Sequence, residues 1–335
     1  MKVFVVLLSI VAGALHAAQL RAQEGKLEPL VVSYAGVTGG RGPLWIAKDL
    51  GYFEKYGLDV KLVHIAAGST SISALMAGEV NVVLTTSSAA IAAAVRGAPV
   101  VIIATNGSPG YKLVALPSIT SVQQLKGKVI GSSLLGAGSD FALRKLLPKI
   151  GLNPATDVSI VPTGLSESNK RMLLMFQGKI DATLATADNV MQLELKGQKV
   201  SVLADLRENG VYVSGTDIST TRQFLKSSPL RLKAFLKAFS DGIWTGRNNK
   251  EISDRVFRKY LRIDEQKLLD SMHKTYFLSG QIPLKPYPQP EAIQSDLEYL
   301  SISNPAAKGK TPADVTDVTL LNELEAEGFF SRLHR

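Results

Sequence analysis

The hydrophobic and polar positions of the chain follow one pattern twice, 100 residues apart. Residues 73–104 (SALMAGEVNVVLTTSSAAIAAAVRGAPVVIIA) align without a gap with residues 173–204 (LLMFQGKIDATLATADNVMQLELKGQKVSVLA). In each copy an amphipathic stretch ends at a glycine, an apolar run and a small polar turn follow, and a second amphipathic stretch ends at a glycine before another apolar run. The pattern predicts helix, strand, helix and strand, the order typical of a parallel α/β sheet.

Several residues recur at equivalent places in the two copies. The identical pairs are Gly78 and Gly178, Leu84 and Leu184, Thr86 and Thr186, Gly97 and Gly197, and Ala104 and Ala204, and Asn81 stands opposite Asp181. Upstream, GVTGGRGPLWIAKDLGYFEKYGL corresponds more loosely to LLGAGSDFALRKLLPKIGL, each a glycine loop followed by an amphipathic helix and a Gly-Leu cap. The sequence pattern common to α/β proteins could produce so few identities, but the matching order of helix, glycine and strand signals favours a true repeat. We therefore expect two related α/β lobes that face each other.

The turns that precede the predicted helices are the candidate binding site. In open α/β sheets, ligands bind at the carboxyl ends of the strands, where loops lead into helix starts. The candidates are Thr38, Gly39, Arg41, Gly68, Ser69, Thr70, Thr86, Ser87 and Ser88 in the first lobe, and Gly138, Ser139, Asp140, Ser166 and Asp188 in the second. Ser, Thr and Asp are also ordinary helix N-caps, so each single position stays open between capping and binding.

Charged residues at these turns point to two kinds of ligand. Arg41 favours an anion, because a guanidinium forms paired hydrogen bonds with a carboxylate or sulfonate; a plain surface arginine is the alternative. Asp140 and Asp188 favour an amine or hydroxyl group, or else cap helix starts. The charge of the ligand therefore stays open. Trp45 and Phe141, which follow the glycine loops, are expected in the core, with stacking on the ligand as the less favoured alternative.

GAGSD, residues 136–140, resembles part of the G-x-G-x-x-G dinucleotide fingerprint. Phe141 stands where the third glycine is needed, and the next predicted strand ends in Thr163 and Gly164 without an acidic residue for a ribose. The loop also has a counterpart in the other copy, TGGRG at 38–42. A cleft that grips a small solute from both sides explains this pair better than a nucleotide site does.

The N-terminus predicts export. Residues 1–22 contain Lys2, an apolar run and then small residues, the pattern of a secretory signal peptide cleaved near Ala18 or Ala22; a retained membrane anchor is the less favoured alternative. Cleavage after Ala22 removes two of the 38 basic residues and none of the 29 acidic ones, so the net charge changes from +9 to +7. The basic residues are scattered, so we expect no nucleic-acid partner. No second long apolar stretch follows, and we expect a soluble mature protein.

The chain of 335 residues contains no cysteine and four histidines. Disulfides, thiolate metal sites and a lipoprotein anchor are therefore excluded. His64 and His273 are not paired with other ligands at a metal-binding spacing, so structural or surface roles are favoured and no metal is expected. An exported, cysteine-free chain of this size fits a bacterial periplasm.

Three stretches carry a resemblance to a known family: GPLWIAKDLGYFEKYGLDVKLV (42–63), AAGSTSISALMAGEVNVVLTTSSAA (66–90) and GKVIGSS (127–133). They resemble periplasmic substrate-binding proteins of ABC importers, of the nitrate/sulfonate/taurine type related to the NMT1/THI5-like proteins. The resemblance implies a type II-like fold of two α/β lobes with mainly parallel sheets, a hinge between them, and a small-molecule ligand in the cleft. Lobe one would comprise residues 27–112 and 212–335, and lobe two residues 113–211, with crossovers near 111–115 and 209–214.

The same resemblance implies a monomeric binding protein without a cofactor, which delivers a small polar or anionic organic solute to a permease and its ATPase. An enzyme of the pyrimidine-precursor synthase type is one alternative. Its chemistry is expected to need a cysteine-rich segment and a reactive histidine, and His64 alone supports it weakly. A periplasmic sensory module that docks on a receptor is the other alternative, since it would share the fold.

Overall fold

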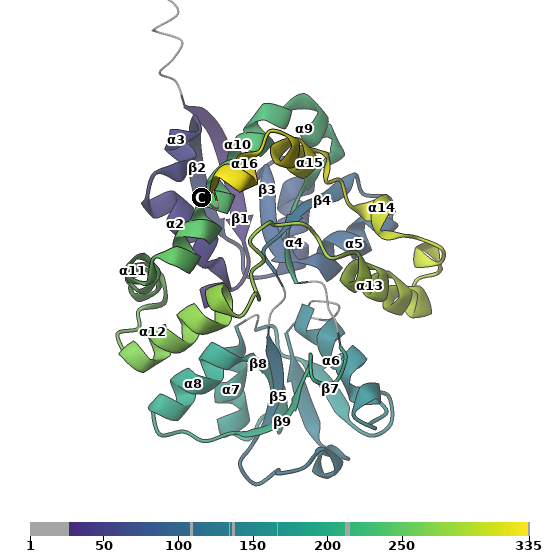
Figure 1. Cartoon of the computed structure of the whole chain (residues 1–335). Coiled ribbons are helices and arrows are strands. Elements are labelled where there is room, and N and C mark those ends of the chain that lie inside the picture. The colour runs from purple at the N-terminus through teal and green to yellow at the C-terminus, as the bar shows by residue number, and fades with distance from the viewer. Residues whose placement is uncertain are drawn as a thin grey trace, which may run out of the picture.

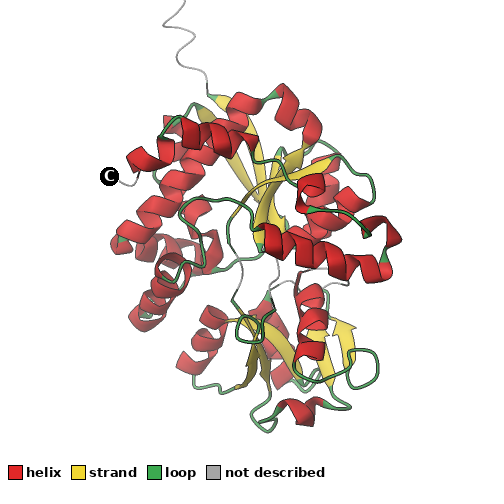
Figure 2. Cartoon of the chain, turned by 45° about the vertical axis from the view of Figure 1, so that its right-hand side comes forward, coloured by secondary structure: helices red, strands yellow, loops and turns green. Residues whose placement is uncertain are grey.

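The computed structural model describes residues 27–107, 110–133, 135, 138–165, 167–211 and 215–333. They form two lobes, each built on one five-stranded sheet (Figures 1 and 2). The larger lobe contains both ends of the described chain, and the smaller lobe contains its middle. The expected signal peptide, residues 1–22, lies outside the described residues.

The sheet of the larger lobe has the strand order β2-β1-β3-β10-β4. Its strands are β1 (Glu28–Tyr34), β2 (Leu58–His64), β3 (Val82–Thr86), β4 (Val100–Thr105) and β10 (Thr216–Thr221). β1 pairs in parallel with β2 and β3, whereas β10 pairs antiparallel with β3 and β4. Four strands therefore run in one direction, and only β10 opposes them.

The sheet of the smaller lobe repeats this arrangement in the order β7-β6-β8-β5-β9. Its strands are β5 (Tyr111–Ala115), β6 (Val129–Ser132), β7 (Ser159–Pro162), β8 (Ala182–Thr186) and β9 (Ser201–Asp205). β6 is parallel to β7 and β8, and β5 is the strand that runs antiparallel to its neighbours. The repeat predicted from the sequence is thus present in the topology.

The first crossover lies earlier than the sequence predicted. Residues 111–115 are not a connection but strand β5, because their backbone pairs with β8 and β9 and because Leu113 and Ala115 are buried in the core of the smaller lobe. The chain therefore crosses between Thr105 and Tyr111. Part of the second expected crossover, 209–214, lies outside the described residues, but the two connections meet beside it: Asn106 N donates to Thr216 O over 2.7 Å, and Thr216 N to Gly107 O over 2.9 Å.

Helices cover both faces of each sheet (Figure 1). Those of the larger lobe are α2 (Gly42–Asp49), α3 (Tyr52–Lys55), α4 (Gly68–Met76), α5 (Ser87–Val95), α9 (Arg222–Ser227), α10 (Pro229–Asn248), α11 (Lys250–Leu261), α12 (Gln266–His273), α13 (Pro290–Ser303), α14 (Pro312–Val315), α15 (Thr319–Ala326) and α16 (Phe329–Leu333), with the short turns η1 (Gly39–Arg41), η4 (Pro305–Ala307) and the π-helical η3 (Lys274–Leu278). Those of the smaller lobe are α6 (Gly138–Lys149), α7 (Ser168–Phe176) and α8 (Ala187–Leu195), with the turn η2 (Val122–Leu125).

Alternation along the strands divides the core of the larger lobe into two layers. Val82 and Leu84 of β3 pack with α2 and α10 on one face, while Val83 packs with α4, α5 and α13 on the other. Trp45 and Phe141 are buried, as predicted, and Trp45 stacks on Tyr260 with ring centroids 4.7 Å apart.

The repeat also sets where helices begin and end. α4, β3 and α5 start 100 residues before α7, β8 and α8, respectively. Gly78 and Gly178 follow α4 and α7 with φ of 76° and 70°, the left-handed conformation that ends a helix and that glycine adopts without strain. Because the helix starts are fixed by the repeat, the two lobes present equivalent turns to each other.

Candidate functional site

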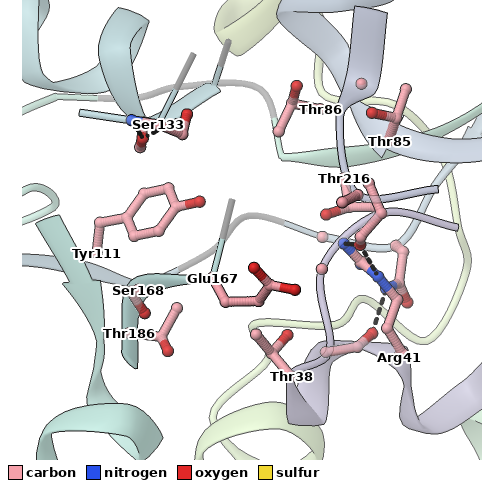
Figure 3. Close-up of a pocket in the computed structure, with 18 of the residues that line it drawn as sticks. Thr38, Arg41, Thr85, Thr86, Tyr111, Ser133, Glu167, Ser168, Thr186 and Thr216 are labelled. Carbon is pink, nitrogen blue, oxygen red and sulfur yellow. Dashed lines mark hydrogen bonds between the residues drawn. The ribbon is translucent and has the colours of Figure 1, made fainter. Parts of the chain in front are cut away.

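A small cavity lies between the two lobes. Its volume is about 100 Å³, well below the roughly 300 Å³ at which sites for drug-sized ligands begin. The larger lobe contributes Ala35, Gly36, Thr38, Gly40, Arg41, Ala66, Ala67, Gly68, Thr85, Thr86, Asn106, Gly107, Thr216, Tyr276, Gln281 and Ile282, and the smaller lobe contributes Tyr111, Ser133, Ser139, Glu167, Ser168, Arg171 and Thr186. Figure 3 shows the two sets facing each other across the cavity. A solute of a few heavy atoms fits there.

Six helices begin at the wall of this cavity. Residues at or beside the starts of α2, α4 and α5 in the larger lobe and of α6, α7 and α8 in the smaller lobe line it; they are Arg41, Gly68, Thr86, Ser139, Ser168 and Thr186. A helix start presents the positive end of the helix dipole and, in general, unpaired backbone N–H groups. At α2 the Gly42 N–H donates to Gly39 O and Pro43 has no N–H, so this helix contributes chiefly its dipole. Six such starts around one small space create a positive potential that favours a negatively charged group.

Arg41 adds a full positive charge to this wall. Its side chain is buried, and Nε and Nη2 donate to Ala35 O over 2.8 and 2.5 Å. Burial lowers the pKa of the guanidinium to about 10, partly opposed by nearby tyrosine hydroxyls, so it stays protonated at neutral pH. Among the described residues, no carboxylate lies within ion-pair distance of Arg41. Its remaining N–H groups are therefore suited to an anionic ligand.

Arg171 of α7 is the second buried arginine at the cavity, and its hydrogen bonds go to the protein. Nε donates to Thr183 Oγ1 over 3.0 Å, Nη1 to Leu165 O over 2.8 Å and Nη2 to Leu184 O over 2.9 Å. Burial lowers the pKa of the Arg171 guanidinium, while Tyr111 and Glu167 raise it. Arg171 thus holds the wall of the smaller lobe in place and contributes its charge from behind that wall.

Polar groups of the wall offer acceptors as well as donors. Thr85 Oγ1 and Asn106 Oδ1 are buried and have no hydrogen-bond partner within the described ranges. Asn106 Nδ2 donates to Gly40 O, which fixes the orientation of the amide. The Glu167 carboxylate points into the space between the lobes (Figure 3) and lies 3.4 Å from Lys170 Nζ. A ligand with an anionic end and a hydrogen-bond donor matches these groups best.

Tyr276 lines the cavity and joins the lobes. Its hydroxyl donates to Asp188 Oδ1 of α8 over 2.7 Å, a buried hydrogen bond between the larger and the smaller lobe. Burial, and then the charge of Asp188, raise the pKa of this hydroxyl well above its usual value. The ring lies against Gly39, where an added Cβ would come within 2.4 Å of Tyr276 Cε2. Gly39 therefore serves the site by leaving room for this ring.

The structure brings together five of the candidates that we named from the sequence. Thr38, Arg41, Gly68, Thr86 and Ser139 line the cavity. Three further candidates are not among the lining residues. Gly39 packs against the Tyr276 ring, Asp188 accepts a hydrogen bond from the Tyr276 hydroxyl, and Gly138 is the first residue of α6. Ser166 lies outside the described residues.

The other candidates do not reach the cavity. Ser69, Ser88 and Asp140 line a separate, larger cavity of about 720 Å³ between α4, α5 and α13 on one side and α6 on the other. Thr70 is exposed, and Ser87 Oγ donates to Gly215 O and to Asp217 Oδ2. The physical reason is helical geometry: successive residues turn by about 100°, so neighbouring residues at a helix start face different directions and only some of them face the cavity.

The residues of the site that were not foreseen from the sequence include Tyr111, Glu167, Arg171 and Tyr276. The repeat relates Tyr111 to a residue of the other lobe: Tyr111 pairs with Thr186 as Thr216 pairs with Thr86. All four residues line the cavity, so the repeat is a signal by which Tyr111 could have been found. Tyr276 has none, since it lies far along the chain in the C-terminal helices. Tertiary packing alone brings it to the site.

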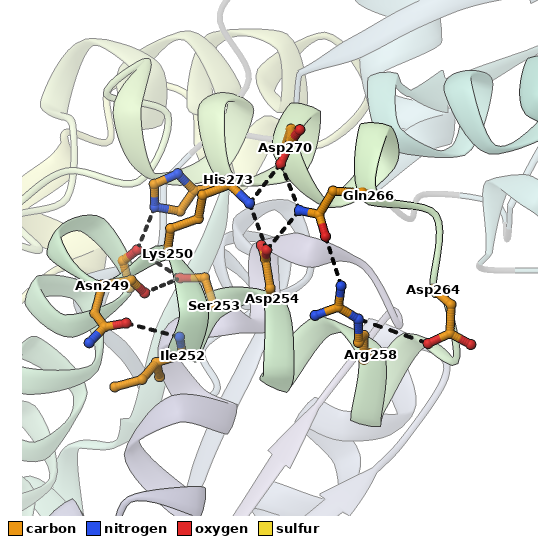
Figure 4. Close-up of polar contacts among 11 residues, drawn as sticks. Asn249, Lys250, Ile252, Ser253, Asp254, Arg258, Asp264, Gln266, Asp270 and His273 are labelled. Atoms are coloured by element: carbon orange, nitrogen blue, oxygen red, sulfur yellow. Dashed lines mark hydrogen bonds and ion pairs between the residues drawn. The ribbon is translucent and has the colours of Figure 1, made fainter.

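The two histidines in the described ranges, His64 and His273, do not line the cavity. His64 is exposed, while His273 is buried with Nε2 3.0 Å from Gly246 O (Figure 4). Around it, Lys250 contacts Asp254 and Asp270, each at 2.6 Å, and Gln266 bonds to both aspartates, so this network joins α11 to α12. Within the described ranges, no group of three or more His, Asp or Glu side chains is arranged to hold a metal ion.

Known structures define the class of fold. The alkanesulfonate-binding protein SsuA of Xanthomonas axonopodis pv. citri, solved with bound MOPS, superimposes with a TM-score of 0.71 at 17% identity, covering 88% of this chain and 100% of that one. The periplasmic nitrate-binding protein NrtA of Synechocystis PCC 6803 gives a TM-score of 0.69 at 14% identity, covering 92% and 91%. The predicted two-lobed periplasmic-binding-protein fold is therefore confirmed.

The chain belongs to the NMT1/THI5-like family, whose model matches residues 41–250. A curated relative is the 4-amino-5-hydroxymethyl-2-methylpyrimidine phosphate synthase THI13 of Saccharomyces cerevisiae, 27% identical over 212 residues. The match covers 58% of this chain and 60% of the length of that relative. In the described part of the chain, none of the helices has the length and apolar character needed to cross a membrane.

Proposed function

We propose that this protein is the periplasmic solute-binding component of an ABC-type importer, and that it encloses a small anionic organic solute between its lobes. The observation that carries the proposal is the convergence of six helix starts and the buried Arg41 on one small cavity. The structural likeness to sulfonate- and nitrate-binding proteins supports the same class of solute. Export through the N-terminal signal peptide is part of the proposal.

In the proposed mechanism the solute enters while the lobes are apart. Its anionic end binds Arg41 and helix-start N–H groups of the larger lobe, and the smaller lobe then closes with Ser139, Ser168 and Thr186. Closure is favoured because the solute binds the closed form more strongly than the open one. The closed protein delivers its solute to a permease, whose ATPase supplies the energy, so this chain needs no catalytic group and acts as a monomer.

The test is a thermal-shift screen of mature protein against small sulfonates, carboxylates, pyrimidines and amines. A one-site ligand at 100 times its Kd stabilises the folded state by about 2.7 kcal/mol, which is visible as a higher melting temperature. We expect hits among the smallest anions, especially those that also carry a hydrogen-bond donor. A screen without an anionic hit, or with hits only among bulky neutral compounds, would contradict the proposal.

Pyrimidine-phosphate synthesis is the second candidate, because the curated relatives carry that name. The absence of cysteine from the sequence, and the distance of His64 and His273 from the cavity, favour binding over this chemistry. Incubation of the purified protein with a pyridoxal-type cofactor decides between them. Formation of a pyrimidine phosphate product would replace the transport proposal with an enzymatic one. Capture of a receptor in place of a permease would instead identify a sensory module.

A further inference from the structure

A second contact between the lobes lies away from the solute cavity, where α6 of the smaller lobe meets α13 of the larger lobe (Figure 1). Lys145 Nζ of α6 lies 3.1 Å from Asp296 Oδ1 and donates to Ser295 Oγ over 2.7 Å. The Lys145 side chain is 10% exposed and that of Asp296 only 1%. This is the most deeply buried ion pair described between or within the lobes.

Aromatic packing reinforces the α6–α13 contact. The ring of Phe141 on α6 meets that of Tyr299 on α13 edge to face, with centroids 4.7 Å apart. Lys145 Nζ lies 5.3 Å from the Phe141 ring centroid, within cation–π range. The ammonium group is therefore held by a carboxylate, a hydroxyl and an aromatic face, all within one contact.

Both helices are fixed to their own lobes, so the contact can open only when the lobes separate. Ile293 and Leu297 attach α13 to the core that contains α4 and α5. Leu143 and Leu146 attach α6 to the core of the smaller lobe. The ion pair does not belong to the wall of the solute cavity.

The energetics of such a pair depend on lobe position. In separated lobes, both charges are hydrated. In closed lobes, both side chains are largely withdrawn from water, and each compensates part of the other's charge. Removing one partner takes this ion pair from a charge that stays buried, which raises the free energy of the closed form more than that of the open form.

We infer that Lys145 and Asp296 form a closure lock, which sets the fraction of closed protein, and hence the affinity and lifetime of the solute complex, without touching the solute. This inference rests on the proposed function, that the lobes close around a solute. Lys145 is thus a positioning residue: it acts through the relative placement of the lobes. Apparent affinity falls in proportion to the population of the binding-competent form.

The test compares Lys145→Met and Asp296→Asn with wild type by solute titration, stopped-flow dissociation and small-angle X-ray scattering. The solute used is the strongest anionic hit of the thermal-shift screen. We expect both variants to bind it about tenfold more weakly or worse, mainly through faster dissociation. Both should also show a larger radius of gyration without solute. Lys149→Met on the same helix is the matched control, because its side chain is exposed, and it should leave all three readouts unchanged.

The double variant Lys145→Met/Asp296→Leu distinguishes the ion pair from simple damage. Replacing both charges of a buried pair with apolar side chains is often neutral, so affinity and scattering should return close to wild type. Single variants that bind and scatter like wild type would overturn the lock, as would a double variant as impaired as either single one. If wild type binds no screened solute, the proposed function fails, while scattering of the solute-free variants still tests the lock.

Discussion

The two lobes share one topology and divide the chemistry of the site between them. At matched positions of the two sheets, Thr216 pairs with Thr86 and Tyr111 pairs with Thr186, and all four line the cavity. At the next residue of β10 and of β5, the matched positions carry different side chains. Asp217 of β10 is buried between Thr85 and Thr105, whereas Lys112 of β5, between Ala185 and Asp205, reaches Asp205 over 3.2 Å.

The arginines show the same division of labour. Arg41 of the larger lobe is buried with its charge uncompensated by any described carboxylate, whereas Arg171 of the smaller lobe donates to three protein acceptors. A repeated scaffold fixes where the cavity lies, and the side chains then take separate tasks. In the proposed function, the larger lobe supplies the charge that binds the solute, and the smaller lobe supplies a firm wall that closes against it.

The largest expected effect comes from Arg41→Met. Charge-assisted hydrogen bonds contribute about 1.5–3 kcal/mol each, so losing those to the anion should weaken solute binding about 100-fold or more by calorimetry. Because burial disfavours the charged guanidinium, as its lowered pKa indicates, the solute-free variant should melt at or above the wild-type temperature. Arg41→Lys is the matched control and should recover part of the affinity, since it keeps the charge without the fork.

Arg171→Met, unlike Arg41→Met, should lower the melting temperature of the solute-free protein. It leaves Leu165 O, Leu184 O and Thr183 Oγ1 without their buried donor, at a cost of about 1–3 kcal/mol for each group left unsatisfied. Removing the desolvated charge offsets part of this loss. We expect a net destabilisation of about 2–4 kcal/mol, seen as a lower melting temperature without solute. A variant that melts normally but does not bind would show that Arg171 contacts the solute directly and would break the comparison.

The raised pKa of Asp217, in the larger lobe, predicts that the stability of the protein depends on pH. Burial raises its pKa to about 6, against the donated hydrogen bonds of Ser87 and Thr105, and Asp296 raises it further. Since the unfolded pKa is near 3.9, the folded protein binds this proton more tightly, and stability falls as the pH rises from about 4 to about 6. The loss is of the order of 3 kcal/mol at most.

The measurement is the melting temperature of wild type and Asp217→Asn from pH 4 to 8. The difference between the two curves isolates Asp217 from the other carboxylates. Stability of the variant relative to wild type should increase across pH 4–6 and then stay level. A constant difference over the whole range would mean that Asp217 is ionised in the folded state throughout, like an ordinary surface aspartate.

The sequence predicted the scaffold well because periodicity encodes it. The interval of 100 residues places β3, α5 and α4 opposite β8, α8 and α7, and the structure confirms the two-lobed α/β fold. The candidate turns also lie at the right edge of each sheet. Within a turn, however, the sequence did not show which residues face the cavity: Gly68 lines it, while Ser69 and Thr70 turn away with the helix.

Residues brought in by tertiary packing could not be predicted. Tyr276 reaches the site from η3, and Asp296 and Tyr299 meet α6 from α13, and no local pattern marks these encounters. The first crossover was placed too late because YKLVA reads equally well as a connection or a short strand. Backbone pairing with β8 and β9 decides it. Local signals therefore define the elements, and long-range packing completes the site.

The smallest expected effect concerns Asn81 and Asp181, which make the same hydrogen bond in the two lobes. Asn81 Oδ1 accepts from Val31 N over 2.9 Å, and Asp181 Oδ2 accepts from Val129 N over 2.8 Å, so both tie the start of a strand to its neighbour. Asp181→Asn should keep this bond and change the free energy of unfolding by less than about 0.5 kcal/mol. Asp181→Ala, which leaves the Val129 N–H without its acceptor, should cost about 1–2 kcal/mol by urea denaturation. Equal losses in both variants would show that the carboxylate charge, with Lys128 Nζ 3.9 Å away, is what the smaller lobe needs, and that the two lobes are not interchangeable even here.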